Sequence, residues 1–66
     1  MNGSAVVQTE KVGQFRGASL WKDTTEDGHW SYRLMKGDHL ICRDRQRKYL
    51  NEIMYQVGEG FINVLE

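Results

Sequence analysis

The chain has 66 residues, with nine lysines and arginines and nine aspartates and glutamates, so its formal net charge is zero. A chain this short forms one domain with a thin core and leaves little room for a substrate pocket of several hundred Å³. The charge balance shows neither the basic excess typical of binding nucleic acid by phosphate contacts alone nor the acidic excess of a DNA mimic. We therefore expect a binding module rather than an enzyme.

Cysteine content and the N-terminal segment indicate the compartment. The only cysteine, Cys42, allows no internal disulfide, whereas small secreted domains usually need such crosslinks. Residues 1–7 lack the basic region and apolar run of a signal peptide, and no apolar run is long enough to span a membrane. These features predict a soluble, cytoplasmic protein without a membrane partner.

The first third of the chain predicts a tail, a strand and a loop. Residues 1–11 are mostly small or polar and are expected to form a flexible tail, which leaves residues 12–66 as one domain. Residues 12–22 predict a strand interrupted by Gly13 and Gly17. An acidic loop follows over residues 23–28, because Asp27-Gly28 is a strong turn signal.

Two further strands are predicted by alternation of apolar and polar residues. In residues 29–35, Trp30 and Leu34 share one face with Tyr32, and the opposite face carries Arg33 and Met35. Residues 39–43 form the next predicted strand, in which Leu40 and Cys42 lie opposite Ile41. The short connections favour antiparallel neighbours.

Beyond residue 43 the apolar period changes from 2 to about 3.6, which indicates a helix. Asp44 suits the N-cap and Gly58 the left-handed C-terminal position, so the helix is predicted over residues 45–57. Its apolar stripe consists of Tyr49, Leu50, Ile53, Met54 and Val57. With a last strand over residues 61–65, the order is β-β-β-α-β. The predicted fold is α+β, a small, mostly antiparallel sheet with one amphipathic helix packed on one face.

No catalytic, cofactor or metal site is expected. The residues His29, His39 and Cys42 lack the paired spacing of metal ligands, and on a regular strand the last two point to opposite faces. Nothing in the sequence directs a histidine toward the cysteine, which favours a small, inert core side chain at Cys42.

The leading functional hypothesis rests on the sheet face that one helix cannot cover. Apolar residues on such a face usually mark an interface, and tryptophan is a frequent anchor. The candidate partner-binding residues are Trp21, Trp30, Arg33, Met35 and Ile41. They predict a non-catalytic regulator or inhibitor that occludes a surface of a larger protein, as small accessory proteins of phages and mobile elements do. A homodimer is a further option.

The alternative is a nucleic-acid-binding domain. A basic cluster lies where the third strand becomes the helix, and it consists of Arg43, Arg45, Arg47 and Lys48. Free N–H groups and the dipole at a helix N-terminus favour anions, and Arg33 could extend the patch across the sheet. A three-stranded sheet followed by a helix resembles, in architecture alone, the small DNA-binding domains that lay a sheet in the major groove. A third interpretation is a solvated helix face in which Glu52 pairs with Lys48.

Overall fold

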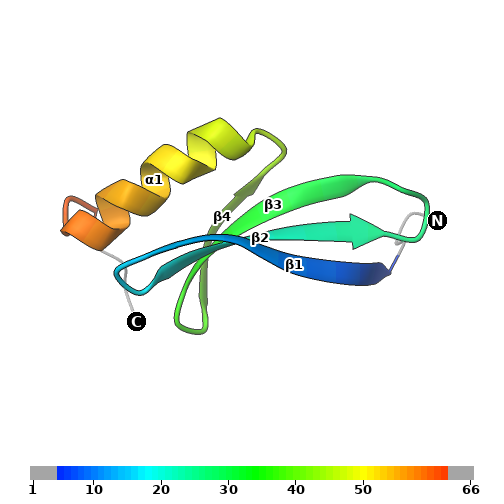
Figure 1. Cartoon of the computed structure of the whole chain (residues 1–66), viewed down its shortest axis with the longest axis horizontal. Helices are drawn as coiled ribbons and strands as arrows, with labels where there is room; N and C mark the ends of the chain where they lie inside the picture. The colour runs from blue at the N-terminus through cyan, green and yellow to red at the C-terminus, as the bar shows by residue number, and fades with distance from the viewer. Residues whose placement is uncertain (1–4, 63–66) are drawn as a thin grey trace.

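The computed structural model describes residues 5–62, which form a four-stranded sheet followed by one helix (Figure 1). The elements are β1 (Val6–Phe15), β2 (Ala18–Thr25), β3 (Trp30–Lys36), β4 (His39–Asp44) and α1 (Arg47–Glu59). The strands lie in the order β1-β2-β3-β4, and every pair of neighbours is antiparallel. The structure thus confirms an α+β domain whose single helix packs on one face of an antiparallel sheet.

The first strand replaces most of the predicted tail. Residues 6–11 pair with the second half of β2, with Lys11 opposite Trp21, so the prediction of a tail is wrong for this segment. Residues 1–4 lie outside the described residues. Residues 12–22 are also not one strand, because Arg16 and Gly17 form a tight hairpin turn with φ angles of 49° and 90°. A two-residue turn with positive φ at both positions matches the right-handed twist of the strands it joins. Because arginine rarely adopts a positive φ, the sequence did not indicate a turn here.

The core lies between the helix and the middle of the sheet. Its buried members are Ala18, Leu20, Leu34, Leu50, Met54 and Val57. Of the predicted helical stripe, Leu50, Met54 and Val57 are buried, and Ile53 is partly buried against the core. Tyr49 remains 53% exposed because it lies at the margin of the stripe. Figure 1 shows α1 over one end of the sheet, while β1, β2 and β3 extend beyond it on the right. Both faces of that extension are free of the helix.

An irregularity in β4 changes which side chains share a face. Leu34 pairs with Cys42, but Met35 pairs with Leu40, so Ile41 is an extra residue between the two pairs. A bulge of this kind breaks the alternation of a strand. Leu40 and Cys42 therefore lie on opposite faces, and Ile41 packs against the core instead of pointing outward as predicted.

The helix begins and ends two residues later than predicted. Gln46 occupies the N-cap position without a side-chain hydrogen bond, while the Asp44 carboxylate accepts a hydrogen bond from the Gln46 backbone N–H at 2.8 Å. Gly60, with φ of 88°, ends the helix in the left-handed conformation that glycine favours. Gly58 is therefore inside the last turn rather than after it.

Close packing explains the glycine inside the helix. A Cβ atom at Gly58 would overlap a ring carbon of Phe15 and would lie 2.9 Å from the Phe15 carbonyl oxygen. The Phe15 ring also packs on Tyr55, with ring centroids 4.7 Å apart. Only glycine lets the helix approach the end of β1 this closely.

The predicted last strand is not seen in the described part of the chain. Phe61 and Ile62 form a bend after the helix, and Ile62 packs against the core. The remaining residues of that prediction, 63–65, lie outside the described residues.

Gly58→Ala tests the contact between α1 and β1. Alanine favours a helix over glycine by about 1 kcal/mol, but here its methyl group would overlap Phe15. Overpacking of this kind costs about 1–3 kcal/mol, so we expect a net loss of stability in urea unfolding. Gln56→Ala, at an exposed position of the same helix, is the control and should change stability by less than about 0.5 kcal/mol. A more stable Gly58→Ala variant would contradict the packing described.

Candidate functional site

Four side chains form a row across the sheet on the face that the helix leaves uncovered. The register aligns Lys11 with Trp21, Trp21 with Arg33, and Arg33 with Arg43. Paired residues share a face, and successive residues of a strand alternate between faces. Because Leu20 faces the helix, this row faces away from it. We call these four residues the cationic row.

The indole of Trp21 lies between two of these cations. The Lys11 Nζ is 5.4 Å from the ring centroid, and the Arg33 Cζ is 5.3 Å from it. Both distances are within the range of cation–π attraction. The indole N–H donates a hydrogen bond to the Ser19 hydroxyl at 3.0 Å, which fixes the ring orientation. The ring thus holds the two cations on either side of β2.

A buried carboxylate orients the two arginines of the row. Asp23 is only 4% exposed although it lies on the same helix-free face. It accepts hydrogen bonds from the Thr9 hydroxyl at 2.9 Å, from Arg33 Nε at 2.7 Å and from Arg43 Nη1 at 3.1 Å. Arg43 Nη1 also donates to the Ser31 hydroxyl at 2.8 Å. These five residues form the Asp23 network.

The ionised form of Asp23 is favoured by this network. Burial raises the pKa of the carboxyl group, but hydrogen bonds from Arg33, Thr9 and Arg43 together outweigh burial and lower the pKa below its usual value. Asp23 is therefore charged at neutral pH, and one carboxylate holds two guanidinium groups in place.

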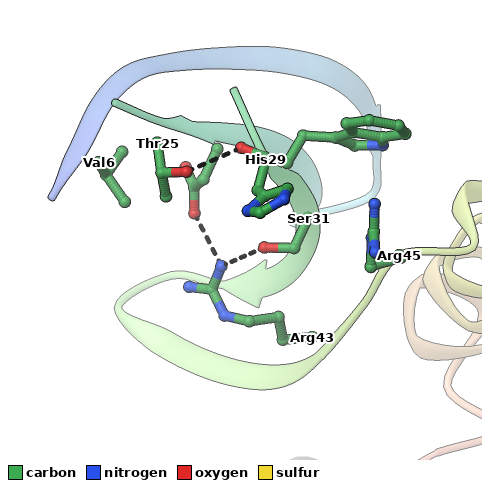
Figure 2. Close-up of a pocket in the computed structure, with 8 residues that line it drawn as sticks. Val6, Thr25, His29, Ser31, Arg43 and Arg45 are labelled. Atoms are coloured by element: carbon green, nitrogen blue, oxygen red, sulfur yellow. Dashed lines mark hydrogen bonds and ion pairs between the residues drawn. The ribbon is translucent and has the colours of Figure 1, made fainter. Parts of the chain in front are cut away.

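A surface hollow of about 340 Å³ adjoins the network at the free end of the sheet (Figure 2). The hollow forms because β4 ends at Asp44, which pairs with Tyr32. Residues 30–31 of β3 therefore pair with β2 on one side but have no described strand on the side of β4. Figure 2 shows Arg43 reaching toward Ser31, with Arg45 on the neighbouring part of the chain. The side chains that line the hollow include Asp23, Thr25, Trp30, Ser31, Arg43 and Arg45.

The second tryptophan lies at the rim of this hollow. Trp30 alternates with Ser31 and so projects from the other face of the sheet, beyond the end of the helix, where it is 42% exposed. The Arg45 Cζ lies 4.9 Å from its ring centroid and the Lys22 Nζ 5.8 Å from it. Each tryptophan is therefore bracketed by two cations, on different faces of the sheet.

The partner-binding candidates do not form one surface. Arg33 and Met35 share the helix-free face, as their alternation predicted, and the register adds Trp21 to it. Trp30 projects from the other face, and Ile41 is partly buried against the core because of the bulge. Their role in binding stays a prediction.

The predicted basic cluster is also divided. Arg43 turns to Asp23, and Arg45 lies over Trp30, so these two share the hollow. Arg47 instead donates to the backbone carbonyl of Val12 at 3.0 Å, on the other side of the sheet. Lys48 is an exposed helical residue.

The two charged residues Lys11 and Asp23 were missed in the sequence, as were the hydroxyl partners Thr9 and Ser31. Lys11 was assigned to a tail, and Asp23 to a solvated acidic loop. A signal for Asp23 exists in its parity, because it follows Trp21 by two residues and so shares its face. Its arginine partners are 10 and 20 residues away, and only strand pairing brings them together.

Cys42 is partly buried on the helix-covered face. It pairs with Leu34 and packs against the core. Burial raises the pKa of the thiol, and the nearby Asp44 carboxylate raises it further. The bulge places His39 on the same face, contrary to the prediction of opposite faces. Among residues 5–62, no three side chains of the metal-ligating types come together.

Asp23→Asn tests the network through the pH dependence of stability. A carboxyl group whose pKa is lowered by folding stabilises the protein above its unfolded pKa of about 3.9, and this contribution is lost as pH falls through the folded pKa. We expect the substitution to cost about 1–3 kcal/mol in urea unfolding at pH 7. The difference from the parent should shrink below about pH 4.

Asp38→Asn is the matched control, because Asp38 is exposed in the turn between β3 and β4. It should leave stability within about 0.5 kcal/mol of the parent at either pH. A constant difference between Asp23→Asn and the parent from pH 7 to acid would contradict a stabilising charge at Asp23.

The Cys42 thiol is expected to be unreactive. Because the thiolate is the reactive form, a raised pKa and partial burial should both slow its modification. Reaction with a chromogenic disulfide reagent at neutral pH should be several times slower in the native protein than in denaturant. A native rate equal to the denatured rate would show that the thiol is accessible and ionisable.

No helix among residues 5–62 has the length and apolar character needed to cross a lipid bilayer. Comparisons of the chain with protein-family models, with curated proteins and with solved structures give no significant match.

Proposed function

We propose that the protein binds nucleic acid through the helix-free face of its sheet, with the cationic row contacting phosphates. The observation that carries this proposal is the alignment of three cations, Lys11, Arg33 and Arg43, on one face of the four-stranded sheet. The buried Asp23 orients the two arginines. Basic side chains with fixed geometry are suited to phosphate oxygens, which accept charge-assisted hydrogen bonds.

The two arginines keep donors for a ligand. A guanidinium has five N–H donors. In the Asp23 network, Arg33 uses its Nε and Arg43 its Nη1, and Arg43 remains 44% exposed. Other nitrogens of both groups can contact a phosphate without breaking the network. Because the side chains are ordered before binding, less conformational entropy is lost on association.

A net charge of zero is compatible with this function because the charges are segregated. The cationic row carries three positive charges beside one carboxylate, that of Asp23. Of the other acidic residues in the described part of the chain, Glu10 and Asp44 occupy strand positions on the opposite face, paired with Lys22 and Tyr32. The rest lie in turns or on the helix, at Glu26, Asp27, Asp38, Glu52 and Glu59. Association with a polyanion depends on the local field of a surface rather than on the total charge.

A protein partner on the same face is the second candidate. It is supported by Met35 and Leu40, which pair beside the cationic row, with Leu40 54% exposed. Tryptophan, methionine and arginine are enriched in the cores of interfaces. A larger protein whose surface is occluded, or a second copy of the chain, would bury these residues together with Trp21.

Charge-neutral variants of the row test the proposal. Lys11→Gln/Arg43→Gln removes two of the three proposed phosphate contacts. Binding of a labelled oligonucleotide of generic sequence should weaken by about tenfold or more at low salt. The slope of log K against log salt should shrink by about 1.5 units, because each lost phosphate contact removes about 0.7–0.9 units. Fluorescence anisotropy over a salt series measures both quantities.

The matched control is Arg47→Gln/Lys48→Gln, which removes the same charge from the helix. It should keep the parent affinity within about twofold, because these residues lie away from the row. Equal losses in the two double variants would show a nonspecific charge effect. No binding by the parent at low salt would refute the proposal. If the parent then self-associates in sedimentation and Trp21→Ala does not, the result would support the second candidate, with a second copy of the chain as the partner.

A further inference from the structure

The hollow at the free end of β3 combines groups that suit two parts of one nucleotide. Arg43 and Arg45 line it together with the Ser31 hydroxyl group, and all three side chains can donate to a phosphate. Trp30 lines the same hollow and keeps 42% of its surface exposed. An aromatic ring beside paired arginines is a platform on which an unstacked base can stack while its phosphate is held.

The contact of Arg45 with Trp30 is exchangeable. Arg45 is itself exposed, and its Cζ lies 4.9 Å from the centroid of the indole ring. A base that stacks on the ring can displace the guanidinium toward the adjoining phosphate. The base then takes the place of the guanidinium on the indole ring, and Arg45 gains a charge-assisted hydrogen bond to the phosphate.

The width of the sheet argues against insertion into a duplex groove. At the cationic row all four strands are paired, so the outer strand axes are about 14 Å apart at a spacing of about 4.8 Å. The major groove of B-DNA is about 12 Å wide. The three-stranded architecture considered from the sequence would fit that groove, but the addition of β1 makes the flat face too wide for it.

We propose that the hollow formed by Ser31, Arg43, Arg45 and Trp30 is a nucleotide subsite, and that the nucleic acid bound is single-stranded. This inference rests on the proposed function and specifies its ligand. The bound nucleic-acid strand lies along the cationic row and turns around the open edge of β3. There one base stacks on Trp30, and the phosphate of that nucleotide contacts Arg43 and Arg45. Bases within a duplex are paired and stacked, so they cannot occupy the subsite.

Three labelled probes of equal length separate stacking from charge. They are an oligothymidylate of about twelve nucleotides, a duplex of about twelve base pairs, and an abasic deoxyribose-phosphate strand of about twelve units. Thymidine is chosen because its bases stack weakly on one another. Affinities for Trp30→Ala, Trp30→Phe and the parent are measured by anisotropy at low salt, after urea unfolding confirms that each variant is folded.

The parent should bind the oligothymidylate more tightly than either other probe. Trp30→Ala should weaken oligothymidylate binding by about tenfold and leave the duplex and abasic affinities within about twofold. Trp30→Phe should retain most of the affinity because a ring remains. Tyr49→Ala, which truncates an aromatic residue on the helix that is 53% exposed, is the control and should change none of the three affinities.

The outcomes distinguish failure of this inference from failure of the proposed function. If Trp30→Ala leaves all three affinities unchanged, or lowers all three equally, the subsite is refuted while the cationic row stands. The same holds if the parent binds the duplex as tightly as the oligothymidylate. If the parent binds none of the three probes at low salt, the proposed function itself fails.

Discussion

One helix of 13 residues can cover only one face of a four-stranded sheet, and the rest of this structure follows from that constraint. The covered face holds the small core around Leu20, Leu34 and Met54. Within residues 5–62 no apolar layer covers the other face, so polar groups there must be satisfied by water or by one another. The Asp23 network satisfies them, because it links β1, β2, β3 and β4 through one carboxylate.

The position of this carboxylate has energetic consequences. Removing a charged group from water is costly unless opposite charges and hydrogen bonds compensate. Asp23 receives three hydrogen bonds, two of them from arginines. Arg43 keeps 44% of its side chain exposed, which limits its own desolvation, whereas Arg33 is only 23% exposed and is compensated by its 2.7 Å contact with Asp23. The same arrangement keeps long, otherwise mobile side chains in one orientation. A structural ion network thereby becomes an ordered cationic surface.

The two tryptophans extend this arrangement to both faces of the sheet. Trp21 separates Lys11 from Arg33 on the helix-free face, and Trp30 lies between Lys22 and Arg45 beyond the helix. The sheet continues past the helix at that end, so the second platform is accessible from the edge. Aromatic rings flanked by cations can bind a chain that alternates planar bases and phosphates, which is the chemistry of the proposed ligand.

Local patterns in the sequence determined the parts of the structure that depend on near neighbours. The period of 3.6 identified the helix and its buried residues Leu50, Met54 and Val57, because residues three and four apart share a helix face. Strict alternation identified β3 and placed Arg33 opposite Trp30. The Asp27-Gly28 turn was recognised from its dipeptide.

Tertiary structure alone decided the features that depend on distant segments. Strand pairing converted the predicted tail into β1 and brought Lys11 into the cationic row. The bulge at Ile41 reversed the faces of its neighbours, and the approach of Phe15 explained a glycine inside the helix. No local sequence pattern indicates these features, because each depends on a contact with a residue that is distant along the chain. The candidate site is of the same kind, since the partners of Asp23 come from three other strands and meet only when the register is set.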